Sequence, residues 1–170
     1  MAENIRWIAQ KNLYSCGPIA ILNTLKWIGF PISYKQNYKF WKKKCRCTEG
    51  GTHQHYFQIC LNNIKNATII SKNLPTIESI EHALASDQII IMKSSYVLDK
   101  RKIEGHFFII SKMTEEQFFC VNVEGKHMWY NKKLFAQYYL QYHRAYCDFC
   151  GTSNFCGISP YAWFVKKQYV

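Results

Sequence analysis

The stretch Gln10-Lys11-Asn12-Leu13-Tyr14-Ser15-Cys16-Gly17-Pro18 decides the expected fold of this 170-residue chain. Proline is tolerated in a first helical turn, and apolar residues then recur at helical spacing, so a helix is expected over Pro18–Ile28 with Cys16 at its start. The aligned peptide dipoles at a helix N-terminus favour a thiolate. The backbone N–H of Cys16 and the side-chain amide of Gln10 can both face an oxyanion. The stretch therefore predicts a nucleophilic cysteine.

Such a cysteine needs a base, and the base needs a third group that orients it. His106 follows Gly105 at the start of an apolar stretch, so its ring is expected to project from the edge of a strand. Asn122 lies sixteen residues later, near the end of the next expected strand, where its amide oxygen can accept a hydrogen bond from the imidazole. Glu124 points to the same face two residues on and is the alternative orienter.

The order of the predicted elements indicates the fold class. Further helices are expected over Ser33–Trp41, from Thr52 through Leu61, over Thr76–Ala85 and over Lys132–Tyr142, and strands over Ala67–Ser71, Gln88–Met92, His106–Ser111, Gln117–Val123, Lys126–Tyr130 and Ala162–Lys166. Ser94–Glu104 is largely polar and is expected to be a loop. No capping box is expected at Thr76, because the third residue after it is Ser79. Helices precede most strands, which predicts one α+β domain over residues 1–170, with N-terminal helices packed on a mainly antiparallel sheet.

The joint order and spacing of these motifs resembles the papain-like cysteine peptidases that process bacteriocin precursors after a double-glycine leader. The matching residues, over roughly residues 8–125, are Gln10, Cys16-Gly17-Pro18, Asn23, Gly51-Thr52, Gly105-His106 and Asn122. The family usually shows Asp-Pro where this chain has Asn122-Val123. The resemblance implies that Cys16 is the nucleophile and His106 the general base and acid. It implies further that Asn122 is the orienter and Gln10 an oxyanion donor.

The resemblance also implies a substrate class. Gly51, Thr52 and Gly105 are expected beside the substrate, and a narrow cleft would favour small residues such as glycine before the cut peptide or isopeptide bond. The catalysis would need no cofactor. Deubiquitinase-like cleavage, acyl transfer and deamidation on the same triad stay open, since hydrolysis and transfer differ only in whether water or an amine enters second. A non-catalytic basic module that binds nucleic acid or protein is the alternative of another class.

Composition limits the partners. The formal charge of +11 implies acidic partners, among them an acidic protein substrate, or nucleic acid. The run Tyr38–Lys44 mixes aromatic residues with lysines, as in a nucleic-acid patch or the solvated end of an amphipathic helix. No apolar run is as long as a membrane helix and no secretory signal is visible, so a cytoplasmic protein is expected. The excess of lysine over arginine suggests an AT-rich genome, such as that of a bacterium, phage or large virus.

The eight cysteines raise the question of a metal. The candidate ligands of a structural zinc ion are Cys45, Cys47, Cys147 and Cys150, with Cys156, His53, His55 and His143 as further candidates. The other interpretation is a set of reduced, partly buried thiols. Cys60 and Cys120 lie in apolar patterns and are expected in the core. His53 and His55 either line the cleft or lie on the solvated surface.

Overall fold

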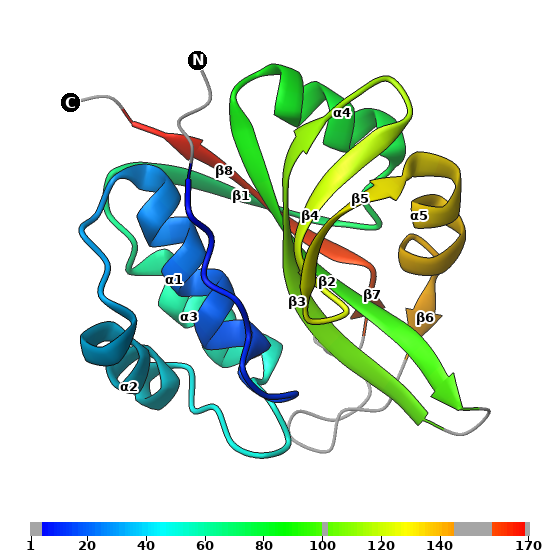
Figure 1. The fold of residues 1–170 in the computed structure, drawn as a ribbon. Helices are drawn as coiled ribbons and strands as arrows, with labels where there is room; N and C mark the ends of the chain where they lie inside the picture. Colours follow the sequence, from blue (N-terminus) through cyan, green and yellow to red (C-terminus); the bar gives the residue numbers. More distant parts are fainter. Residues whose placement is uncertain (1–4, 100–101, 145–157, 169–170) are drawn as a thin grey trace.

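The helices and the sheet form the layers that the sequence predicts. The computed structural model describes residues 5–99, 102–144 and 158–168. Helices α1 (Cys16–Ile28), α2 (Tyr34–Lys44) and α3 (Gln54–Asn62) lie to one side of the sheet, and α4 (Ile77–Ala85) and α5 (Lys132–Tyr139) lie to the other (Figure 1). The α+β class with a mainly antiparallel sheet is therefore confirmed.

The main sheet has six antiparallel strands in the order β1-β8-β2-β3-β4-β5. Their bounds are β1 Ala67–Asn73, β2 Gln88–Asp99, β3 Lys102–Met113, β4 Gln117–Val123, β5 Lys126–Asn131 and β8 Tyr161–Lys167. Two short strands, β6 (His143–Arg144) and β7 (Ile158–Ser159), pair separately. The C-terminal strand β8 lies between β1 and β2, so the last strand in the sequence is inserted between the first two.

The sheet has a hydrophobic core on each face, because successive side chains of a strand point to opposite sides. Ile89 and Ile91 of β2 pack in the core shared with α1 and α3. Ile90 and Met92 pack in the core shared with α4 and α5. This double burial explains the continuous apolar runs Ile89–Met92 in β2 and Phe107–Ile110 in β3.

Several boundaries differ from the predicted ones. The predicted loop Ser94–Glu104 is wrong, because β2 runs to Asp99 and β3 starts at Lys102, with pairs from Ser94–His106 to Val97–Ile103. Backbone hydrogen bonds between β2 and β3 hold these polar strand ends together, and such bonds form without apolar side chains. Helix α2 continues three residues beyond Trp41, and α5 ends at Tyr139.

Two predicted helix caps also need correction. Helix α3 begins at Gln54, and its cap is His53, whose Nδ1 accepts a hydrogen bond from the His55 N–H, instead of Thr52. Helix α4 does have a capping box: Ser79 Oγ accepts from the Thr76 N–H and Thr76 Oγ1 accepts from the Ser79 N–H. A serine hydroxyl reaches back as a Glu or Gln side chain would.

Candidate active site

Cys16 is the first residue of α1 and is 4% exposed. The helix ends at Gly29, whose φ of 102° is a left-handed conformation that glycine adopts without strain. The backbone N–H groups of Cys16, of Gly17 and, with the largest effect, of Phe107 in β3 interact with the Cys16 sulfur and favour its ionised form. The last contact joins the start of the helix to the residue that follows His106.

Phe107 is open to this contact because β4 stops pairing with β3 before reaching it. The ladder between the two strands ends at the pair Ile109–Val121. Phe107 still pairs with Lys93 of β2 on its other side. The sulfur of Cys16 therefore lies at a place where the sheet opens between β3 and β4.

Gly17 is needed because the Gly-Thr segment packs directly against the start of α1. A Cβ atom at residue 17 would lie 2.6 Å from Thr52 Oγ1 and 2.7 Å from Thr52 Cβ, closer than such atoms approach in proteins. Thr52 is short and β-branched, so it cannot swing away cheaply. The two motifs that precede and follow α2 in the sequence are thus packed together beside Cys16.

Two asparagine side chains hold the extended segment that carries Gln10. Asn23 of α1 donates to the Ile8 carbonyl at 3.0 Å and accepts from the Ile8 N–H at 2.8 Å. Asn122 of β4 donates to the same carbonyl at 2.9 Å and accepts from the Gln10 N–H at 3.0 Å. The segment is therefore bound between the helix and the sheet by amide groups that act as a neighbouring strand would.

His106 is buried on β3, and its Nε2 lies 2.7 Å from the backbone carbonyl oxygen of Asn122. A carbonyl only accepts, so Nε2 carries the hydrogen and donates it. In the neutral imidazole, Nδ1 then holds the lone pair. The ring is thus oriented with Nδ1 as its basic nitrogen.

The contact differs from the predicted one, in which the side-chain oxygen of Asn122 would accept from the imidazole. Asn122 has a φ of 63°, and the register of β4 with β5 shifts at this point, so that the backbone carbonyl turns toward His106. Asparagine tolerates this left-handed conformation better than most residues. Its carbonyl also accepts from the Gly125 N–H at 3.3 Å, and its N–H donates to His127 Nδ1 at 3.2 Å.

Gln10 and His106 both line a cavity of about 810 Å³. Its wall includes three tyrosines and a carboxylate, namely Tyr130, Tyr138, Tyr139 and Glu124. No motif in the sequence predicts these tyrosines as site residues, although they cluster within and just before the expected helix Lys132–Tyr142. The hydroxyl of Tyr139 donates to Glu124 Oε1 at 2.6 Å. Glu124, the alternative orienter, therefore contacts Tyr139 and acts on His106 through its charge.

The side chain of Gln10 lies in this cavity with its amide turned toward the segment that follows it. Gln10 Nε2 donates to the Asn12 carbonyl at 2.5 Å, and Gln10 Oε1 is buried with no hydrogen-bond partner in the described part of the chain. An amide nitrogen carries two hydrogens. The second one is available for another acceptor.

The other predicted substrate-binding residues lie around this centre. Thr52 touches the start of α1, as described above. Gly51 has a φ of 92°, in the left-handed region, and precedes it in a turn with Thr48. Gly105 is exposed and directly precedes His106 in β3. His53 is partly buried and His55 is exposed.

No family model and no curated protein sequence matches the chain. Solved structures are similar. The peptidase domain of Streptococcus ComA, a bi-functional ABC transporter involved in a quorum sensing pathway, has a TM-score of 0.62 at 13% identity, covering 97% of this chain and 100% of that one. A double glycine motif protease from an AMS/PCAT transporter, in complex with the leader peptide, has a TM-score of 0.58 at 9% identity, with 97% and 93% covered.

A C39-like peptidase from Bacillus anthracis has a TM-score of 0.64 at 12% identity, covering 98% of this chain and 96% of that one. The chain has the papain-like fold of these peptidases. The predicted fold family is thereby confirmed, and at these identities the likeness concerns the fold. None of the described helices is long and apolar enough to cross a membrane.

Within this papain-like fold, burial dominates the electrostatics of the two candidate catalytic groups. It raises the pKa of Cys16 to about 11, outweighing the three N–H groups that lower it. Burial also lowers the pKa of His106, against the opposing effects of the Asn122 carbonyl and of Glu124. Both shifts favour the uncharged form of the group. Burial therefore opposes the thiolate that the helix dipole favours.

The candidate zinc ligands have other partners where they are described. Cys45 donates to the sulfur of Cys60 at 3.3 Å, and Cys47 donates to the Tyr14 carbonyl at 3.2 Å. Among the described residues no group of three His, Cys, Asp or Glu side chains could hold a metal ion. Cys147, Cys150, Cys156 and the side chain of His143 lie outside the described residues. Cys60 and Cys120 are buried, as predicted.

Proposed function

We propose that the chain is a cysteine peptidase in which Cys16 is the nucleophile and His106 the general base and acid. The observation that carries the proposal is the orientation of His106. Its Nε2–H donates to the Asn122 carbonyl and leaves Nδ1 as the base, in the same cavity as Gln10. The next residue, Phe107, contacts the Cys16 sulfur. A base with a defined tautomer and an amide donor thus line one cavity, and the proposed nucleophile lies against the residue that follows the base.

The chemistry starts from the neutral pair. His106 Nδ1 takes the proton of the Cys16 thiol as the sulfur attacks the substrate carbonyl, and the electron pair of the C=O bond moves to oxygen. The oxyanion then collapses, the C–N bond breaks, and His106 returns the proton to the leaving amine. Water adds to the thioester in the same way, giving up a proton to Nδ1. The C–S bond breaks and the thiol regains its proton.

Asn122 has two tasks in this proposal. Its backbone carbonyl holds the Nε2–H of His106 and keeps Nδ1 directed to the proton it must take. Its side chain holds the N–H of Gln10 and so fixes the residue that would donate to the oxyanion. The oxyanion would accept from the Cys16 N–H and from the second hydrogen of the Gln10 amide.

The proposed substrate is a polypeptide with small residues before the cut bond. One similar structure is a double glycine motif protease with its leader peptide, and that substrate class is the first to try here. Peptides that end in Gly-Gly and isopeptides of ubiquitin-like C-termini are the natural probes. Acyl transfer to an added amine would be seen in the same assay, because the acyl-enzyme is common to hydrolysis and transfer.

A peptide electrophile tests the assignment most directly. Gly-Gly peptides with a C-terminal vinyl ester or aldehyde would be incubated with the protein, and the labelled residue would be located by mass spectrometry. We expect labelling of Cys16 that stops when His106 is replaced by alanine. Labelling of another cysteine, or labelling of Cys16 that does not need His106, would refute the assignment.

A further inference from the structure

The positive charge of the chain is concentrated in its helical part. Residues 5–66 contain ten of the 22 lysines and arginines but one of the 11 acidic residues, Glu49. This part therefore carries a net +9 of the formal +11. Uncompensated charge of this density attracts anionic partners and speeds their encounter with the protein.

Helix α2 presents much of this charge at the surface. It lies on the outside of the helical layer, away from the sheet (Figure 1). Lys35, Lys39 and Lys43, which we call the lysine stripe, are exposed and spaced one helical turn apart. No residue of α2 is fully buried, so the helix is held by its partly buried aromatic side alone.

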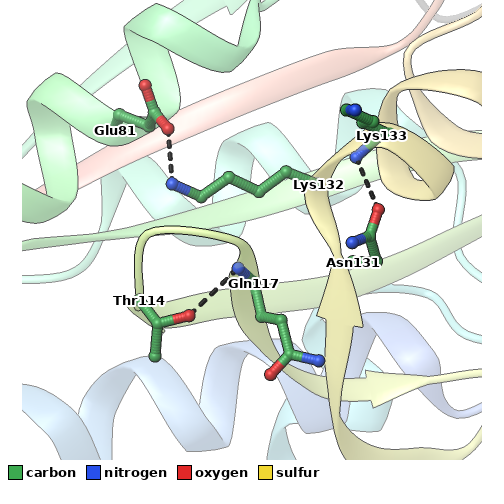
Figure 2. Close-up of polar contacts among 6 residues, drawn as sticks. All are labelled: Glu81, Thr114, Gln117, Asn131, Lys132 and Lys133. Carbon is green, nitrogen blue, oxygen red and sulfur yellow. Dashed lines mark hydrogen bonds and ion pairs between the residues drawn. The ribbon is translucent and has the colours of Figure 1, made fainter.

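The lysine stripe has no acidic partners within the described parts of the chain. None of its three side chains forms an ion pair with a described carboxylate. On the opposite side of the sheet, by contrast, Lys132 lies 2.5 Å from Glu81, and Asn131 caps α5 beside it (Figure 2). Two other lysines of α2 face aromatic rings instead: Lys42 lies over Tyr14 at 5.2 Å and Lys44 over Phe40 at 5.6 Å.

Lys11 links the cavity to the first residue of helix α2. Lys11 lines the cavity, and its Nζ lies 4.7 Å from the centre of the Tyr34 ring at the first residue of α2. Tyr34 stacks on Tyr38 one turn further along, at 5.0 Å between ring centres. A polypeptide that leaves the cavity past Lys11 therefore reaches the start of the lysine stripe.

The spacing of the stripe fits an extended peptide. Four helical residues rise about 6 Å, which separates successive lysines of the stripe. Alternate side chains of an extended chain lie about 6.6 Å apart on one face. Acidic residues at every second position of an extended peptide would thus meet Lys35, Lys39 and Lys43 in turn.

The aromatic residues of α2 favour a peptide over a nucleic acid. Single-stranded nucleic acids need exposed rings on which bases stack. Tyr34 and Tyr38 are half-buried against each other, and Trp41 packs against the core. Phe40 is 52% exposed but has Lys44 beside its ring. The surface thus offers charge with little stacking area.

We propose that the lysine stripe binds an acidic segment of the polypeptide substrate, outside the residues that react. The proposal rests on the proposed peptidase function, because the ligand is the substrate of the same cavity. It assigns to α2 a part in substrate choice that the candidate catalytic residues do not have.

Two matched peptides test whether the lysine stripe binds an acidic segment of the substrate. One dye-labelled peptide has a Gly-Gly centre with glutamates at alternate positions on both flanks, and the second has glutamines there. The variant K39Q/K43Q removes two charges of the stripe, and K72Q/K112Q removes two exposed charges from strands β1 and β3 as a control. Binding is measured by fluorescence anisotropy and cleavage by kcat and KM.

We expect the glutamate peptide to bind and to be cleaved with a Kd and KM about 3- to 10-fold lower than the glutamine peptide at low salt. The advantage should shrink at high salt, since exposed charges are screened. K39Q/K43Q should abolish the advantage of the glutamate peptide and leave kcat unchanged, whereas K72Q/K112Q should keep this advantage. Equal affinity for both peptides, or equal loss in both variants, would overturn the proposal.

Two outcomes separate the stripe from the peptidase function. Binding of the glutamate peptide through the stripe without cleavage would support the stripe and refute the peptidase. Cleavage without preference for the glutamate peptide would refute the stripe and leave the peptidase intact. An oligothymidylate of equal charge serves as the nucleic-acid probe. If it binds more tightly than the glutamate peptide and loses this binding in K39Q/K43Q, the ligand of the stripe is a nucleic acid and the peptide proposal is overturned.

Discussion

Cys16 and His106 are held by two different parts of the molecule. Cys16 starts a helix whose position follows from neighbouring residues: Gly17 fits under Thr52, and Gly29 ends the helix. His106 depends on a strand two places away from the sheet edge and on the turned carbonyl of Asn122. The proposed nucleophile is thus positioned by packing around a helix, and the proposed base by an irregularity in a sheet. The two arrangements should fail in different ways when they are altered.

The largest effect is expected from the nucleophile itself. Cys16→Ala should lower kcat/KM at least about 10³-fold, because no other side chain at this place can form the thioester. The thermal midpoint should change little. Cys120→Ala, which changes another fully buried thiol, is the matched control and should keep activity. Comparable losses in both variants would mean that the loss reports on the fold and not on the nucleophile.

Because Cys16 is buried, the free energy of unfolding is expected to depend on pH in the alkaline range. Its pKa is raised from about 9 to about 11 in the folded protein. The contribution of the buried thiol to the free energy of unfolding is therefore fully present below about pH 9. It is lost as the pH rises through about 11, because the thiol of the unfolded chain ionises first. Wild type should lose about 2 kcal/mol more stability than Cys16→Ala between about pH 8 and about pH 11. Parallel denaturant titrations at each pH would show it. Identical pH profiles would indicate a solvated sulfur.

Asn122 offers a way to test the strand-borne base alone. Asn122→Gly keeps the left-handed backbone and its carbonyl, but loses the side-chain bonds to Ile8 and Gln10. Asn122→Val disfavours that backbone by about 1–2 kcal/mol and should displace the carbonyl from His106. We expect kcat to fall about 10-fold in the glycine variant and about 100-fold in the valine variant. An equal loss in both would assign the role to the side chain, as the sequence had predicted.

The smallest effect concerns the packing at the start of α1. Alanine has a better helix propensity than glycine by about 1 kcal/mol, so Gly17→Ala would stabilise an isolated helix. The contact with Thr52 reverses the sign, and we expect a net loss of about 1–2 kcal/mol, since neither backbone can yield easily. Thermal denaturation would measure it. Gly17→Ala combined with Thr52→Gly should recover much of the loss, whereas a neutral Gly17→Ala would show that the Gly-Thr segment is loosely held.

The helix-borne half of the site was easier to predict than the strand-borne half. The helix over 18–28 and the position of Cys16 follow from residues close together in sequence. Asn122 was singled out for its position, but its carbonyl, not its amide, meets His106, because a positive φ and a register shift turn the backbone. No local pattern announces such a shift. The paired ends of β2 and β3 were predicted as a loop, since polar residues in paired strands have the same sequence pattern as a polar loop.

The sequence by itself determined the layers and the residues at the centre. Helical spacing, the Gly-Pro start and the apolar strands are local consequences of side-chain shape and solubility, so the α+β fold could be predicted. The tertiary structure decided the state of those residues. Burial opposes the charged forms of Cys16 and His106, whereas the helix dipole alone would favour a thiolate. The tyrosine-lined cavity forms where β3, β5, α5 and the N-terminal segment meet. Desolvation and long-range register depend on the whole fold, and a stretch of sequence does not contain them.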